Sequence, residues 1–177
     1  MPSPSYVPIR PASHPERPDM RDPERQQRLL DQAREHLKKH EVVKKMFDEF
    51  DLDVDEIDLV PMGFKPMDVS ARTDHGILWF NEAMLDGSFE DNLHYGVHEL
   101  EHYCQQTTGD KPTEGSSDGD YLGNQEEVDA FQRQVEYMAG KEGKDHAESY
   151  VDQVLDHHDE TGKQREDRKA DLMNNVD

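Results

Sequence analysis

The spacing of two histidines fixes the local structure in the middle of this chain. They enclose the run His98-Glu99-Leu100-Glu101-His102, which has the form H-E-x-x-H. Side chains four positions apart lie on one face of an α-helix, so the run predicts a helix that presents both imidazoles to one point. Glu99 then lies where a carboxylate can reach a water held by a metal ion. The run therefore indicates a zinc hydrolase, with His98 and His102 as metal ligands.

The residues around the motif predict a helix from Asp91 to about Gln106. The two histidines lie about 130–170° from the centre of its apolar stripe, which places them off the predicted core face. The single cysteine lies on that stripe and is expected to be a packed thiol rather than a ligand. The stripe spans about 60° on a helical wheel and consists of Leu93, Val97, Leu100 and Cys104.

A third ligand is expected, because catalytic zinc usually has three protein ligands and a water. The next predicted helix runs from Gln125 to about Ala139 and begins with three acidic residues. Glu127 lies about 60° from the apolar stripe of that helix, Asp129 about 140° and Glu126 about 160°. Glu127 is therefore the favoured third ligand, and Glu126 and Asp129 are the alternatives.

Three runs of sequence together resemble the minimal gluzincin-type zinc metallopeptidases. This group includes small phage and bacterial zincin-like proteins and, more distantly, the ImmA/IrrE-type peptidases. The runs are Gly76–Asn81, Val97–His102 and Glu127–Phe131. In such families a strand precedes the H-E-x-x-H helix, and a downstream helix with an E-x-x-A pattern supplies the third ligand.

The resemblance covers about residues 55–140 and implies a role for each motif residue. It implies that His98, His102 and Glu127 bind Zn²⁺ and that Glu99 is the catalytic base. It also implies an α+β, zincin-like fold. In that fold a small, mostly antiparallel sheet packs on the motif helix, and further helices precede and follow it.

The order of patterns along the chain predicts three parts. Residues 1–21 hold most of the ten prolines and are expected to form a flexible arm. Residues 22–158 are expected to form the zincin-like domain, which begins with a helix capped by Asp22 and broken near His40. Residues 159–177 are expected to be a charged tail that frays or stays disordered.

Three strands are expected in the first half of this domain. They are Ile57–Val60, Met67–Arg72 and Gly76–Asn81, with Thr73–Gly76 as the hairpin turn between the last two. The third strand is either an edge strand that pairs with extended substrate or an ordinary buried strand.

The overall composition limits the classes of function. The chain has 177 residues, 32% of them hydrophobic, and a mean hydropathy of −1.09, so one compact core is expected. The net charge of −21 argues against a nucleic-acid partner, because phosphate contacts need lysine and arginine. No segment has the apolar character of a signal peptide or a membrane span. A cytoplasmic location is expected, in the host cytoplasm or a virion if the protein is phage-encoded.

The leading hypothesis for the function is a zinc-dependent peptidase that acts on a protein or peptide substrate. The alternative is a catalytically degenerate zincin-like domain with a structural or interaction role, such as a virion component or a regulator. A metal hydrolase that does not cleave peptides is a third possibility. The oligomeric state stays open, as does the group that stabilises the oxyanion, for which the candidates are Tyr95, Tyr121, Tyr137, His146 and Tyr150.

Overall fold

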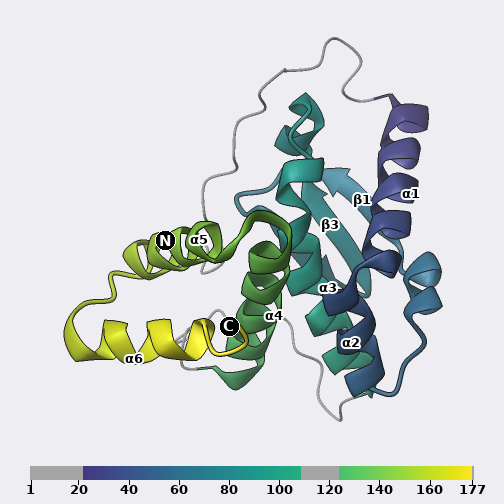
Figure 1. The fold of residues 1–177 in the computed structure, drawn as a ribbon. Helices are drawn as coiled ribbons and strands as arrows, with labels where there is room; N and C mark the ends of the chain where they lie inside the picture. Colours follow the sequence, from purple (N-terminus) through teal and green to yellow (C-terminus); the bar gives the residue numbers. More distant parts are fainter. Residues whose placement is uncertain (1–21, 109–123, 177) are drawn as a thin grey trace.

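The computed structural model describes residues 22–108 and 124–176. The predicted arm and most of the loop predicted between Thr107 and Gly123 lie outside these residues. The described chain has an α+β fold (Figure 1). Its elements are α1 (Pro23–Lys39), α2 (Glu41–Glu49), η1 (Val54–Leu59), β1 (Met62–Lys65), β2 (Ala71–Asp74), β3 (Ile77–Asn81), η2 (Glu82–Asp86), η3 (Glu90–Asn92), α3 (Leu93–Thr108), α4 (Gln125–Glu142), α5 (Lys144–His157) and α6 (Gly162–Leu172).

The first two helices confirm the predicted start and the predicted break. The Asp22 side chain accepts a hydrogen bond from the backbone N–H of Glu24 at 3.1 Å and so caps α1. His40 has an extended backbone, and its Nδ1 accepts a hydrogen bond from the backbone N–H of Val42 at 3.2 Å. The same residue therefore ends α1 and caps α2.

The sheet is mixed rather than mostly antiparallel, with the strand order β1-β3-β2. β2 pairs with β3 in antiparallel register, and the turn between them has positive φ at His75 and Gly76, as a type I′ hairpin requires. β1 pairs with β3 in parallel register. Because β3 is the central strand, the interpretation of Gly76–Asn81 as an edge strand is wrong, and β1 and β2 form the edges.

Two of the three strand predictions need correction. Ile57–Val60 is not a strand, because Asp53 caps the 3-10 helix η1 by accepting a hydrogen bond from the N–H of Asp55 at 2.9 Å. The second strand begins at Ala71 rather than Met67. The sequence also gave no signal for β1, whose Gly63 has weak strand propensity. The ring of Trp79 covers that glycine so closely that a Cβ there would lie 2.6 Å from the ring.

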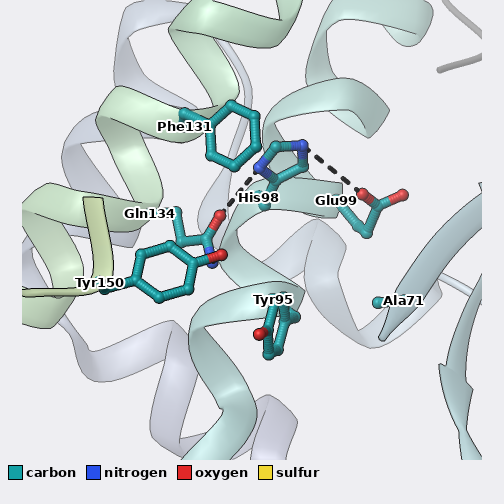
Figure 2. A pocket seen from close by; sticks show the side chains of 7 residues that line it. All are labelled: Ala71, Tyr95, His98, Glu99, Phe131, Gln134 and Tyr150. Carbon is teal, nitrogen blue, oxygen red and sulfur yellow. Dashed lines mark hydrogen bonds and ion pairs between the residues drawn. The ribbon is translucent and has the colours of Figure 1, made fainter. Parts of the chain in front are cut away.

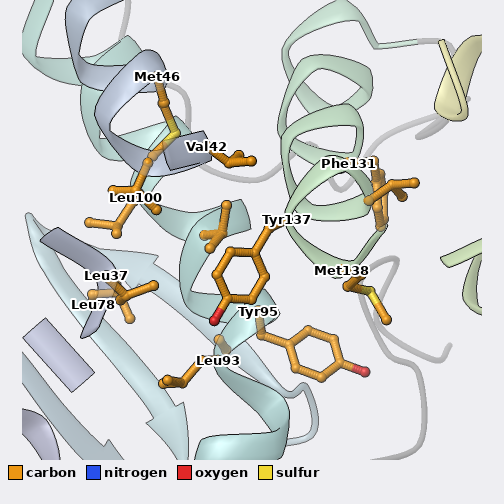
Figure 3. Close-up of a cluster of buried hydrophobic side chains, with 14 of the residues drawn as sticks. Leu37, Val42, Met46, Leu78, Leu93, Tyr95, Leu100, Phe131, Tyr137 and Met138 are labelled. Carbon is orange, nitrogen blue, oxygen red and sulfur yellow. The ribbon is translucent and has the colours of Figure 1, made fainter. Parts of the chain in front are cut away.

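The motif helix α3 lies in the middle of the molecule. It contacts β2 and β3 on one side and α4 on the other, while α2 contacts both α3 and α4 (Figure 1). Gly96 allows the close approach to the sheet, because a Cβ there would meet the Phe80 ring at 3.1 Å. The core on this side joins residues from the N-terminal helices, the sheet, α3 and α4 (Figure 3).

The C-terminal segment differs from the charged tail that the sequence predicted. Residues Gly162–Leu172 form α6, which packs against α4 and α5 (Figure 1). Ion pairs join Arg165 to Asp152 and Asp156 on α5, and Leu172 is buried. The basic residues of the segment thus meet acidic residues of α5, a tertiary match that local charge density does not reveal. In the described part of the chain, no helix has both the length and the apolar character needed to cross a membrane.

Candidate metal centre

Two imidazoles and one carboxylate meet between α3 and α4. The Nε2 atom of His98 lies 3.3 Å from Oε1 of Glu127, and Nε2 of His102 contacts the same oxygen. The three side chains come from one turn of α3 and the first turn of α4. The structure therefore brings together the three residues that the sequence predicted as metal ligands.

The other nitrogen of each imidazole is held by a side-chain amide. Nδ1 of His98 lies 2.9 Å from Oε1 of Gln134, and Nδ1 of His102 lies 2.9 Å from Oε1 of Gln105. A carbonyl oxygen only accepts hydrogen bonds, so each Nδ1 carries a proton. In the neutral ring this tautomer leaves the Nε2 lone pair free for a metal. Histidines that bind zinc usually donate a hydrogen bond from their other ring nitrogen in this way.

The start of α4 explains why Glu127, and neither of the alternatives, meets the histidines. Asn124 caps the helix by accepting hydrogen bonds from the backbone N–H groups of Glu126 and Glu127, at 3.0 and 3.2 Å. Glu127 is 2% exposed. Glu126 and Asp129 are only partly buried, and the Asp129 carboxylate accepts a hydrogen bond from Gln125 at 2.7 Å.

The face of α3 that carries the histidines is buried, whereas the sequence placed it off the core. His98 is 4% exposed and His102 is 3% exposed. The reason is that α4 covers this face, so both sides of α3 are enclosed. Phe131 of α4 adds an edge-to-face contact to the ring of His98, with 4.6 Å between centroids.

Charge complementarity holds the cluster together. Burial by itself would lower the pKa of His102, but the contact with Glu127 outweighs burial and raises that pKa to about 9. Burial would raise the pKa of Glu127, but the contacts with the His102 and His98 imidazoles lower it well below its ordinary value. His102 is thus protonated at neutral pH, and a metal ion that binds here must displace this proton.

Glu99 lies beside this cluster and faces the sheet. Its Oε1 accepts a hydrogen bond from the backbone N–H of Thr73 on β2 at 2.5 Å, and its Oε2 lies 3.9 Å from Nε2 of His98 (Figure 2). His98, Glu99 and His102 offer ligand atoms within 4.8 Å of one another, so this buried group could hold a metal ion. Glu99 is therefore a second candidate, beside Glu127, for the third ligand of such an ion.

A cavity of about 10 Å³ adjoins His98 and Glu99. This volume matches a single water molecule. Of the predicted oxyanion donors, Tyr95 and Tyr150 line the cavity (Figure 2). Tyr137 instead contacts His36, His146 pairs with Glu142, and Tyr121 lies outside the described residues.

Glu101, between the two histidines of the motif, has its own counter-ion. It is 2% exposed, and its Oε1 accepts a hydrogen bond from Nε of Arg133 at 3.1 Å. Arg133 also contacts Glu49 of α2. Burial raises the pKa of Glu101 although Arg133 opposes the shift. This group joins α2, α3 and α4.

Sequence reasoning missed the amides and the backbone group that hold the cluster. Gln134 follows Glu127 by seven residues, which is two helical turns, and Gln105 follows His102 by three. Both spacings place the amide on the helix face that carries a predicted ligand, so this signal was present in the sequence. The contact from Thr73 depends on how the sheet packs on α3 and has no such signal.

No model of a known protein family matches the sequence, and neither a curated protein nor a solved structure matches the chain.

Proposed function

We propose that this protein is a zinc-dependent peptidase with a zincin-like fold. The observation that carries the proposal is the convergence of both Nε2 atoms on the Glu127 carboxylate, while side-chain amides hold both Nδ1 atoms. Two imidazoles and a carboxylate are a ligand set typical of catalytic zinc. In this proposal His98, His102 and Glu127 hold Zn²⁺, and Glu99 is the general base.

The residues of the chain have distinct tasks in the proposed hydrolysis. Zinc, when bound, supplies a Lewis acid that polarises a scissile carbonyl and makes water more acidic. Glu99 takes a proton from the attacking water and passes it to the leaving amine. The hydrogen bond from the N–H of Thr73 fixes one oxygen of Glu99, which leaves the other oxygen to carry the proton.

The position of β2 supports a peptide over other hydrolysable substrates. β2 is an edge strand, and its Thr73 contacts Glu99 through a backbone group. An extended peptide that adds to this edge beside Thr73, whose N–H is held by Glu99, would run past the proposed base, and other main-chain groups of β2 would supply hydrogen bonds.

A second candidate function is a zinc-binding scaffold without turnover, which would serve a structural or interaction role. The observation that favours it is the enclosure of the site. Glu99 is 7% exposed, and the cavity beside it has room for about one water. Both functions require zinc, so metal content alone does not separate them.

The proposal is tested in two steps on the full chain. Elemental analysis should find about one zinc per chain in the wild type and in the control Glu126→Gln, but little in His98→Ala and Glu127→Ala. Zinc-loaded wild type and Glu99→Gln are then compared on a peptide library. Cleavage by the wild type alone supports the peptidase. Zinc without cleavage favours the scaffold, and a wild type that binds no zinc refutes both.

A further inference from the structure

Gln134 connects a metal-ligand histidine to α5. This glutamine on α4 is fully buried. Its Oε1 accepts a hydrogen bond from His98 Nδ1, and its Nε2 lies 2.8 Å from the hydroxyl of Tyr150 and 2.7 Å from Nδ1 of His94. An amide offers two donor hydrogens on nitrogen, and here both have a partner. The network therefore satisfies all three of these bonds in one orientation of the amide.

The orientation of this amide decides which nitrogen of His98 carries the proton. In the observed orientation the carbonyl oxygen faces His98, which requires a proton on Nδ1 and leaves Nε2 for the metal. A rotated amide would present its NH₂ group to His98. Nδ1 would then have to accept, the proton would move to Nε2, and the metal would lose a ligand.

Tyr150 contributes to the observed orientation from outside the motif. Its hydroxyl lies beside Gln134 (Figure 2) and accepts from it, and it is also hydrogen-bonded to Tyr95. A hydroxyl whose proton is engaged by Tyr95 offers Gln134 only a lone pair, so the amide nitrogen must face it. Tyr150 lies on α5, beyond the segment that carries the sequence motifs.

We propose that Tyr150 and Gln134 are positioning residues of the metal centre, which hold His98 in the tautomer that binds metal. The inference rests on the proposed zinc site and extends it to α5. It makes the affinity for zinc depend on the Tyr150 hydroxyl, which is two hydrogen bonds away from the imidazole ring of His98.

The test measures the dissociation constant of zinc by competition with a chromophoric chelator. Loss of a partner of a ligand histidine typically weakens metal binding about 10–100-fold, which is the result expected for Gln134→Leu. Tyr150→Phe removes one hydrogen bond and should weaken binding about 3–10-fold. The control is Tyr137→Phe, since Tyr137 is also a buried tyrosine and its hydroxyl contacts His36 away from the site. It should leave the zinc affinity unchanged.

A second pair of variants separates positioning from packing. A carboxylate at position 134 accepts from Nδ1 of His98 in either orientation, so Gln134→Glu should keep tight zinc binding. In that background Tyr150→Phe should have almost no further effect on the zinc affinity, so the effects of the two substitutions should not be additive. Equal losses from Tyr150→Phe in both backgrounds would mean that the tyrosine only packs, which overturns the inference.

The tautomer itself provides a readout that a packing role would not move. Long-range ¹H–¹⁵N correlation spectra recorded before zinc is added should show the proton of His98 on Nδ1 in the wild type, and a partial transfer of that proton to Nε2 in Tyr150→Phe. Wild-type affinity in Tyr150→Phe refutes the positioning role and leaves the zinc site standing. Absence of zinc binding in the wild type refutes the proposed function itself.

Discussion

Replacement of Arg133 by methionine should destabilise the protein strongly, because it leaves a buried carboxylate without its counter-ion. Arg133 is 8% exposed and its partner Glu101 is 2% exposed, so water cannot take over the lost contact. Removing one member of a buried ion pair typically costs about 3–5 kcal/mol. Arg133 has two further partners. Glu49 is about half exposed at its side chain and adds little to this cost, and Glu136 lies farther away, with its Oε1 3.8 Å from Nη1 of Arg133.

The pH dependence of this loss follows from the pKa of Glu101. Burial already raises that pKa, with Arg133 opposing the shift and Asp129 adding to it. Without Arg133 the folded-state pKa rises further above the unfolded value. The folded protein then binds a proton more tightly than the unfolded chain, so its stability recovers as the pH falls. The loss should therefore be largest at neutral pH and smaller in mild acid.

Urea denaturation followed by circular dichroism measures the effect. With a slope of about 2 kcal/mol/M, a loss of about 4 kcal/mol moves the midpoint by about 2 M. The double variant Arg133→Met with Glu101→Leu should recover most of the stability, since neither charge is left buried. A loss below about 1 kcal/mol in the single variant, or a loss that does not shrink in acid, would refute the reasoning.

Three further predictions concern other parts of the molecule. Zinc at about 100 times its dissociation constant should add about 2.7 kcal/mol to the free energy of unfolding and raise the melting temperature by about 5–10 °C. Calorimetry measures this shift, and His102→Ala should abolish it. Burial and the neighbouring His36 and Lys141 lower the pKa of His40. As the pH decreases, the unfolded chain therefore binds this proton first, and the stability of the protein decreases once the pH is below about 6.5. In urea titrations His40→Asn, which keeps a capping side chain, should show a smaller decrease in stability over this pH range than the wild type. If α6 is part of the folded unit, Leu172→Ala should lower the free energy of unfolding, measured by urea denaturation, by about 2–3 kcal/mol. No change in this free energy would show that the helix is dispensable.

Helical periodicity explains what could be predicted about the site. His98 and His102 meet because the spacing of four residues is local, and Glu127 was favoured over Glu126 and Asp129 by its angle on the wheel alone. The structure brings these residues together. Their roles as zinc ligands, and that of Glu99 as base, stay predictions for the metal analysis.

Features that depend on distant contacts could not be predicted in the same way. The burial of the histidine face depends on α4, which the apolar stripe of α3 does not encode. On β1, Gly63 leaves room for the ring of Trp79, its pairing partner on β3. Helix α6 is charged along its length and depends on acidic partners such as Asp152 on α5. In each case the decisive partner lies far along the chain.

The enclosure of the histidine pair also has a kinetic consequence. A chelator reaches an ion held by side chains that are each less than 5% exposed only when α4 separates locally from α3, and a peptide substrate would need the same opening. Zinc loss to a chelator in excess should then level off at the rate of this opening and become independent of the chelator concentration. The protein would thus retain its metal for as long as these two helices stay packed, whatever the equilibrium affinity of the ligands.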